Sequence, residues 1–345
     1  YYVDLMNPEF TKAFIKEIYE TYYEKYKNSF EGFFTDEPQI SRNGIPWSLT
    51  LPEEYKKAYG DELTDRLIEL FKPVGDYKTT RVRFWKLITD LFSKNFMKQI
   101  YDWCNDHGFK FTGHLVLEES LLSQLVSNGA CMPHYEYFTI PGMDWLGRHN
   151  RYSLTPYQVG SVARQTGKAQ VLSETFAMCG HNVGHDELKW IFEYQMVRGI
   201  NLLCQHLEGY SNRGLRKRDY PPAMYIQQPW WDEYKTFNDA MSRIGMLLSG
   251  GDDGVEVLVI HPQNFVKPLD NTASIDIKVE NVTNKTVSGE MKIKAPEGWS
   301  LKSDTVKFEN LEMAQSRILS VQAEQIKEND MNRYLIGYEI KLDGS

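Results

Sequence analysis

Segments typical of strands and segments typical of helices alternate over the first 208 residues, and this alternation constrains the fold more than any other feature of the sequence. Strands that alternate with helices form parallel sheets with right-handed crossovers. Both a doubly wound sheet and a (β/α)8 barrel satisfy that pattern. Short apolar runs predict six strands, at Tyr1–Leu5, Glu31–Thr35, Phe109–Leu117, Ala130–Phe138 (strand or irregular strand), Ala169–Glu174 and Ile200–Leu207.

The helices between these strands are indicated by apolar residues at helical spacing and by their end signals. Asn7-Pro8-Glu9 combines an N-cap, a proline in the first turn and an acid, so a helix should begin there. We expect its core-facing stripe to be Phe10, Phe14, Ile18 and Tyr22, widened by Ile15, Tyr19 and Tyr26. Further helices are predicted at about Arg81–His107, Leu121–Val126, Pro156–Thr166 and Leu188–Met196, each followed by a glycine suited to helix termination.

A change of pattern follows Gly250-Gly251, where the helical period is lost. Val255–Ile260 is one strongly apolar strand, and Ile275, Ile277 and Val279 then alternate with polar residues. Alternation of this kind, with turns at short intervals, is typical of antiparallel sheets. We therefore predict a partial barrel over residues 1–250, a linking strand over 251–264 and an immunoglobulin-like β-sandwich over 265–345.

Acidic residues stand at the end of every predicted barrel strand, at Asp4, Asp36 with Glu37, Glu118 with Glu119, Glu136 followed by Asp144, Glu174, and Glu208. In a (β/α)8 barrel all these ends surround one mouth, where the active site lies. A doubly wound sheet would spread them along a line, so the pattern favours the barrel. The alternative is that such acids cap helices and solvate loops, which we expect for Asp4 and Glu118.

Paired carboxyl groups are the machinery of glycosidic bond cleavage, one protonated and one ionised. Glu37 and Glu174 each end an apolar strand, three strands apart in the predicted order, and form our first candidate pair. Mutual repulsion around one cavity would raise the pKa of a proton donor. The residues expected to shape the sugar site are Asp36, His114, Glu119, His134, Asp144, His206 and Glu208, with Trp145 stacking on a sugar ring.

Composition excludes several classes of partner. The formal net charge of −8 leaves no basic face for nucleic acid. No apolar run reaches the roughly 18 residues of a membrane span, and no signal peptide is present. Because the chain opens on a predicted strand, we expect an N-terminal portion of the barrel to be missing from it. The four cysteines are widely spaced, which indicates buried free thiols.

Several short stretches together resemble the α-L-rhamnosidase family 106 of glycoside hydrolases and its relatives. They cover about residues 1–262 and comprise Val3–Pro8, Phe34–Pro38, Gly113–Leu115 with Glu118–Ser120, Ile140–Asp144 and Gln228–Trp231. More broadly, if Tyr1–Leu5 is barrel strand three, the chain resembles the glycosidase clan with a glutamate on strand four and another on strand seven. That clan's usual Asn-Glu pair is replaced here by Asp36-Glu37.

The family resemblance implies an inverting glycosidase with a calcium ion near its site. Glu174 and Glu208 would then be the working pair, with Glu37 binding sugar or metal. It also implies an oligosaccharide or glycoconjugate substrate, such as an α-L-rhamnoside of plant or complex glycans, and we expect a secreted or periplasmic bacterial protein. The residues themselves indicate no metal motif, since Gly180 and Gly184 favour a loop rather than a zinc site around His181 and His185.

A second class of function also fits the sequence. The same mouth in a non-catalytic carbohydrate-binding protein, or in an inactive barrel fragment, would bind sugar while its carboxylates stood too far apart to act together.

Overall fold

The computed structural model describes residues 3–41, 44–150, 153–206, 209–250, 272–281, 285–295, 299–312, 315–325 and 337–343. The chain divides into two compact units. Tyr1–Asp61 and Trp85–Asp253 form the first, while Glu62–Phe84 and Gly254–Ser345 form the second. The predicted linking strand over 251–264 lies outside the described residues, and the predicted domain boundaries stay predictions.

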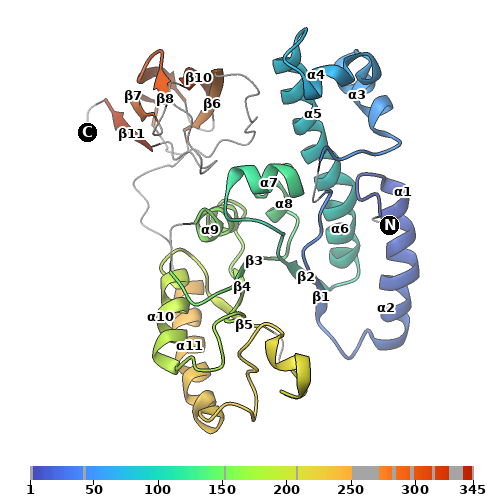
Figure 1. Cartoon of the computed structure of the whole chain (residues 1–345), viewed down its shortest axis with the longest axis vertical. Coiled ribbons are helices and arrows are strands. Elements are labelled where there is room, and N and C mark those ends of the chain that lie inside the picture. Colours follow the sequence, from blue (N-terminus) through green and yellow to red (C-terminus); the bar gives the residue numbers. More distant parts are fainter. Residues whose placement is uncertain are drawn as a thin grey trace. The chain divides into compact units, whose positions relative to one another are not determined.

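The first unit is built on a five-stranded parallel sheet whose strands lie side by side in chain order, β1-β2-β3-β4-β5 (Figure 1). A doubly wound sheet reverses its strand order at a switch point, whereas a barrel adds each strand beside the last. The consecutive order therefore agrees with part of an α/β barrel. The strands are β1 (Gly32–Thr35), β2 (Lys110–Gly113), β3 (Ile140–Trp145), β4 (Leu172–Thr175) and β5 (Leu202–Gln205).

Two of the six expected strands were wrongly placed. Val3–Leu5 lies in an irregular segment and a turn, so the described part of Tyr1–Leu5 is not a strand and cannot serve as barrel strand three. Ala130–Phe138 is not a strand either, because Cys131-Met132-Pro133 starts the short helix α8 (Met132–Tyr135), with the proline in its first turn. The strand of that repeat is β3, a few residues later.

Glycines allow the strands to approach closely just before their carboxyl ends. Gly113 has φ +142°, and a Cβ there would lie 2.1 Å from the carbonyl oxygen of Thr35. A Cβ at Gly142 would lie 2.4 Å from the carbonyl oxygen of Gly113. Because only glycine fits these contacts, β1, β2 and β3 come together directly beneath the residues that follow them.

Helices pack against the sheet and bury one large apolar cluster. Its members include Phe92, Phe111, Phe138, Phe176 and Phe192, all fully buried. The N-terminal helix buries Ile15 and Tyr19, while Ile18 and Tyr22 are exposed. The core-facing side of this helix is therefore rotated away from the predicted stripe that runs through Phe10. Besides α8, the helical segments that lie wholly in this unit are α1 (Pro8–Phe14), the π-helical η1 (Ile15–Glu20), α2 (Thr21–Tyr26), α3 (Leu51–Tyr59), the π-helical η3 (Ser93–Lys98), α6 (Gln99–Asp106), α7 (Leu121–Asn128), α9 (Thr155–Gln165), α10 (His185–Met196), η4 (Gly214–Arg218), η5 (Trp231–Glu233) and α11 (Tyr234–Ser249).

The second unit contains helical residues and two antiparallel sheets. Its helical part comprises η2 (Leu63–Arg66), α4 (Leu67–Phe71) and the start of α5 (Tyr77–Phe92), which continues into the first unit. The sheets have the orders β6-β10-β8 and β11-β7-β9, and Met291, Ile293, Phe308 and Val321 are in their shared apolar cluster. The strands are β6 (Thr272–Glu280), β7 (Val287–Lys294), β8 (Trp299–Leu301), β9 (Thr305–Leu311), β10 (Ser316–Gln325) and β11 (Gly337–Leu342).

Two findings concern the cysteines and the membrane-spanning potential of the described residues. All four cysteines are free, and three of them are buried. None of the helices in the described ranges is both long and apolar enough to cross a membrane.

Candidate active site at the strand ends

Each of the five parallel strands places one polar side chain at the same end of the sheet. Asp36, His114 and His206 directly follow β1, β2 and β5, while Asp144 and Glu174 lie within the last residues of β3 and β4. The register aligns them, since Thr35 pairs with Gly113 and Asp144 pairs with Glu174. Residues far apart in the chain therefore meet because parallel strands end at one edge.

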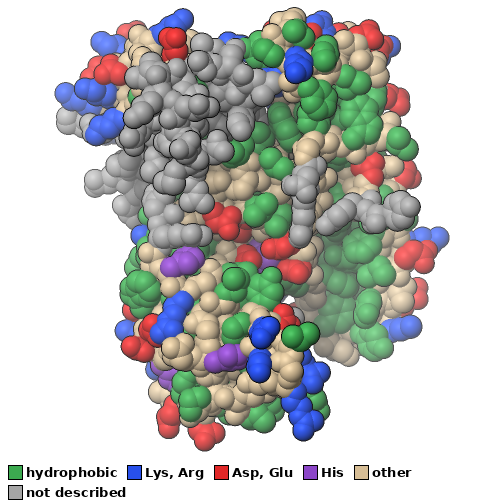
Figure 2. Space-filling model, viewed as in Figure 1, with side chains coloured by type: hydrophobic (Ala, Val, Ile, Leu, Met, Phe, Trp, Pro, Cys, Tyr) green, Lys and Arg blue, Asp and Glu red, His purple; other side chains and the backbone are tan. Residues whose placement is uncertain are grey.

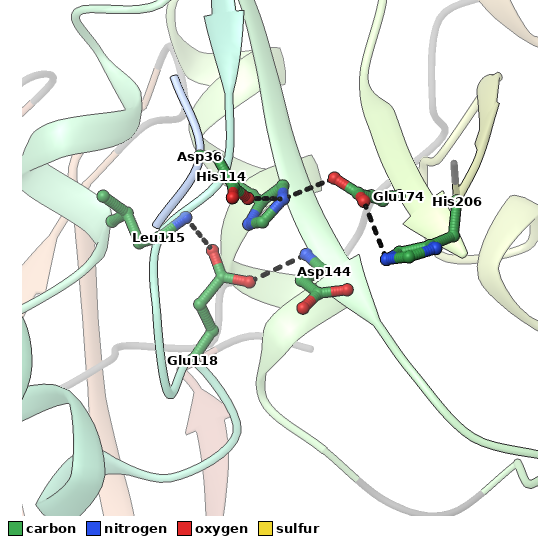
Figure 3. A network of polar contacts seen from close by, with 7 residues as sticks. All are labelled: Asp36, His114, Leu115, Glu118, Asp144, Glu174 and His206. Atoms are coloured by element: carbon green, nitrogen blue, oxygen red, sulfur yellow. Dashed lines mark hydrogen bonds and ion pairs between the residues drawn. The ribbon is translucent and has the colours of Figure 1, made fainter. Parts of the chain in front are cut away.

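Glu174 and His114 form the centre of this cluster. Nε2 of His114 lies 2.7 Å from Oε2 of Glu174 and 3.3 Å from Oδ1 of Asp36. Nε2 of His206 lies 3.8 Å from the other oxygen, Oε1, of Glu174. Figure 3 shows the carboxylate of Glu174 between the two imidazole rings, with Asp144 beside them. On the face drawn in Figure 2, acidic side chains gather near the centre and histidine side chains lie beside them.

The two partners of the central hydrogen bond shift each other's ionisation. Burial alone would lower the pKa of His114, but the hydrogen bond to Glu174 and the charges of Glu118, Asp144 and Glu174 raise it to about 9. Burial acts in the opposite sense on Glu174, where the hydrogen bond and charge of His114, with His206, hold the pKa below its usual value. At neutral pH the pair is therefore an imidazolium beside a carboxylate.

Asp144 is in a different electrostatic situation from Glu174, although the two are register partners. Burial raises its pKa to about 8, opposed by His114 and reinforced by the charges of Glu118, Glu174 and Glu37. Its Oδ1 is buried and has no hydrogen-bond partner among the described residues. A neutral carboxyl group tolerates such a place far better than a carboxylate does. The cluster thus holds one ionised and one protonated acid side by side.

Glu118 is the residue of this region that sequence reasoning missed. We expected it to cap a helix or solvate a loop, but it is only 3% exposed. Its carboxylate accepts hydrogen bonds from the main-chain N–H groups of Leu115 and Asp144 and from the hydroxyl of Tyr135. Burial raises its pKa to about 7, against the opposing effects of His114 and these donors. A fully buried glutamate has no sequence signature that separates it from an exposed neighbour such as Glu119.

The remaining predicted acids occupy contrasting places. Glu37 is half-buried and has a left-handed backbone, with φ +47°, an arrangement that costs a non-glycine residue energy and is common at functional sites. Its charge contributes to the raised pKa of Asp144, so it belongs to the same electrostatic cluster. Glu119 is exposed on the loop before α7. Glu208 lies outside the described residues.

His134 and Trp145 are in the core rather than in the strand-end cluster. His134 is fully buried, with Nδ1 at 2.7 Å from Oγ of Ser93 and Nε2 at 2.8 Å from the carbonyl oxygen of Asn128. Trp145 is 4% exposed and its ring packs against His149 and Tyr194. Both were expected to contact sugar, but neither presents a free ring face or an unsatisfied ring nitrogen to solvent in this arrangement.

A calcium ion does not fit the one compact group of metal-ligand atoms found among the described residues. One ligand atom from each of Asp36, His114 and Glu174 lies within 4.8 Å of the others. Calcium takes six to eight oxygen ligands, whereas one of these three atoms is an imidazole nitrogen. That nitrogen already carries the proton shared with Glu174. The trio is better described as an ion pair flanked by a second carboxylate.

Comparisons with known proteins bear on the fold. No family model and no curated protein matches the sequence. The fold is similar to that of a solved rhamnosidase from Novosphingobium sp. PP1Y, with a TM-score of 0.60 and 17% sequence identity over 72% of this chain and 25% of that one. This chain thus spans a quarter of that protein's length.

A second solved structure, an endo-beta-1,4-mannanase from Thermotoga petrophila, aligns with a TM-score of 0.27 and 9% identity over 84% of this chain and 75% of that one. A TM-score of that size does not establish a shared fold. The comparisons therefore support a fold shared with part of a rhamnosidase.

Proposed function

We propose that this chain carries the active site of a glycoside hydrolase, with Glu174 as the ionised carboxylate and Asp144 as the proton donor. The observation that carries the proposal is the pairing of these two residues in register at one end of the sheet, where their surroundings shift the two pKa values in opposite directions. Two titratable groups whose surroundings push their pKa values apart are the usual mark of an acid and base pair. Glycosidic cleavage needs one carboxyl group of each kind.

In the proposed reaction, the carboxyl group of Asp144 gives its proton to the glycosidic oxygen as the bond to the anomeric carbon breaks. Glu174 then acts on the oxocarbenium-like centre, either by attacking it or by removing a proton from the attacking water. His114 keeps Glu174 ionised and holds its Oε2 in place. The surrounding carboxylates favour the positive charge that develops on the sugar.

Glu37 is the alternative proton donor, as the strand pattern suggested. It follows β1, whereas Glu174 ends β4, so two strands separate them. Asp144 instead lies on the strand next to Glu174, at a backbone spacing of about 4.8 Å. Retaining enzymes hold their carboxyl groups ~5–5.5 Å apart and inverting enzymes ~6.5–9.5 Å apart. Asp144 as donor therefore predicts retention, and Glu37 as donor predicts inversion, which NMR of the first-formed product distinguishes.

The likeness to a rhamnosidase makes α-L-rhamnosides, including those of plant and complex glycans, the first substrates to test. A panel of aryl glycosides should be offered to the protein, with release of the phenol as the readout. We expect Glu174→Gln to lower kcat/KM by about 10³-fold or more, and Asp144→Asn by about 10²-fold or more. Glu53→Gln, an exposed acid on α3, is the control and should leave activity unchanged.

The proposal fails if Glu174→Gln retains activity while folded. Glycoside binding by the wild-type protein, measured by calorimetry, without turnover of any member of the panel would instead indicate a carbohydrate-binding protein. Loss of activity in Glu37→Gln combined with full activity in Asp144→Asn would transfer the role of proton donor to Glu37.

A further inference from the structure

The carboxylate of Glu118 lies behind the proposed proton donor and ties two strand ends together. Its Oε1 accepts from the N–H of Leu115 at 3.0 Å and from the hydroxyl of Tyr135 at 2.7 Å. Its Oε2 accepts from the N–H of Asp144 at 3.0 Å. These bonds join the loop after β2, helix α8 and strand β3, as Figure 3 shows for Leu115 and Asp144.

The loop that carries Glu118 is itself held in one conformation. The carbonyl oxygen of Glu118 accepts a hydrogen bond of 2.6 Å from the side chain of Gln124 on α7, and Ser120 caps that helix through the N–H of Ser123. Leu117, next to Glu118, has a left-handed backbone with φ +56°. A strained residue persists only where its surroundings fix it. The loop therefore has a fixed conformation, and it holds the carboxylate of Glu118 against β3.

We propose that Glu118 is a positioning residue for Asp144, fixing the main chain of β3 at that residue and placing a buried negative charge behind its carboxyl group. This inference rests on the proposed function for its catalytic meaning. Glu118 touches no reacting atom in that scheme, because the three donors that hydrogen-bond to its carboxylate all belong to the protein. Its effect on the reaction passes through Asp144.

The charges around the two acids decide how they influence each other. Asp144 is faced by His114 from β2, by Glu174 from β4, by Glu37 from the β1 end and by Glu118. Glu118 is faced by His114, by the hydroxyl of Tyr135 and by the Cys131 thiol, which its charge affects in turn. His114 lowers the pKa of both buried acids, whereas the charge of Glu118 raises the pKa of Asp144. Removing the charge of Glu118 should therefore make Asp144 ionise more easily.

The test follows the ionisation of Asp144 directly. Carboxyl groups are labelled with ¹³C and titrated by NMR, and the Asp144 signal is the one absent from Asp144→Asn. Glu118→Gln keeps the size of the side chain and removes its charge, so the pKa of Asp144 should fall by about one unit or more. Glu118→Asp restores a charge on a shorter arm and should recover part of that shift.

Tyr135→Phe is the matched control, because it removes one hydrogen bond to Glu118 and keeps the charge and the bond to Asp144. It should move the pKa of Asp144 much less than Glu118→Gln does. If Glu118→Gln fails to fold, the wild-type protein still decides the question. There the Asp144 signal should titrate in two phases, one of them following Glu118, and a single phase would overturn the inference.

The activity readout separates this inference from the function on which it rests. In an active enzyme, Glu118→Gln should shift the alkaline limb of the kcat/KM profile by the same amount as the NMR titration, and lower kcat more than it changes KM. An unchanged Asp144 pKa in folded Glu118→Gln overturns the inference while leaving the hydrolase intact. A shifted pKa in a protein that cleaves no glycoside overturns the proposed function and leaves the pairing of Glu118 with Asp144 standing.

Discussion

The strand-end cluster contains the buried His114 and helix α8 contains the buried His134, and the two rings behave in opposite ways. His114 is 1% exposed and His134 is 0% exposed, so solvent access does not distinguish them. Yet the pKa of His114 is raised to about 9, while burial lowers that of His134 to about 4. For both rings burial is the largest single effect and favours the neutral form.

The neighbours of each ring account for the difference. Both hydrogen-bond partners of His134 are neutral, and the carbonyl oxygen of Asn128 can only accept a hydrogen bond, so Nε2 carries the proton and donates it. Nδ1 is then free to accept from the hydroxyl of Ser93, so the neutral ring satisfies both contacts. His114 meets carboxylates at Glu174 and Asp36. The hydrogen bond to Glu174 and the surrounding carboxylate charges therefore outweigh burial at His114, whereas the charge of Asp90 and the hydrogen bond to Asn128 do not outweigh it at His134.

The largest expected effect comes from giving His114 a neutral partner, as His134 has. Glu174→Gln removes the charge and keeps a polar side chain beside His114. The pKa of His114 should then fall by about 1–3 units, because burial continues to act without its main opponent. Titration of the ring by ¹⁵N NMR measures this directly. Glu53→Gln serves as the control, and an unchanged His114 pKa in folded Glu174→Gln would break the comparison.

A somewhat smaller effect is expected on stability at alkaline pH. A histidine whose folded pKa is raised stabilises the protein fully below the unfolded value of 6.5, and this contribution is lost as the pH rises through about 9. Relative to His114→Gln, the wild-type protein should therefore lose up to about 3 kcal/mol of unfolding free energy between those pH values. Urea unfolding of both proteins at several pH values tests this, and parallel curves would contradict it.

The smallest effect is expected at acid pH and has the opposite sign. Because the folded pKa of His134 is depressed, the unfolded chain binds its proton first, and stability is lost as the pH falls from 6.5 towards about 4. Compared with His134→Gln, the wild-type protein should lose about 2 kcal/mol by pH 5. The same unfolding series measures it. Ser93→Ala, which leaves the ring in place, should retain the wild-type pH dependence.

Most of the fold of the first unit could be predicted because its signals are local. The apolar periodicity and the helix-ending glycines located α7, α9 and α10 to within a few residues, and four of the strands overlap their expected ranges. The errors arose where local signals are ambiguous. Ala130–Phe138 is an apolar run too short for its pattern to distinguish a strand from a buried helix. Pro133 lies in the first turn of α8, a position that favours a helix.

The candidate site could be predicted in part for the same reason. Acids and histidines at strand ends were visible in the sequence, and Asp36, His114, Asp144, Glu174 and His206 come together as the barrel mouth requires. His134 and Trp145 are equally polar or aromatic in sequence but are buried in the core, outside this cluster, and their contact with sugar stays a prediction. Glu118 was undervalued because its three donors come from three separate segments.

By itself, the sequence determined which residue types stand at the strand ends, because strand and helix periods and turn residues act over a few positions along the chain. Only the tertiary structure decided that the pKa of Glu174 is lowered, that the pKa of Asp144 is raised and that Glu118 is buried against the main chain of Asp144. Ionisation depends on burial and on charges within a few ångströms, and those are set by strand register and loop packing between segments tens of residues apart.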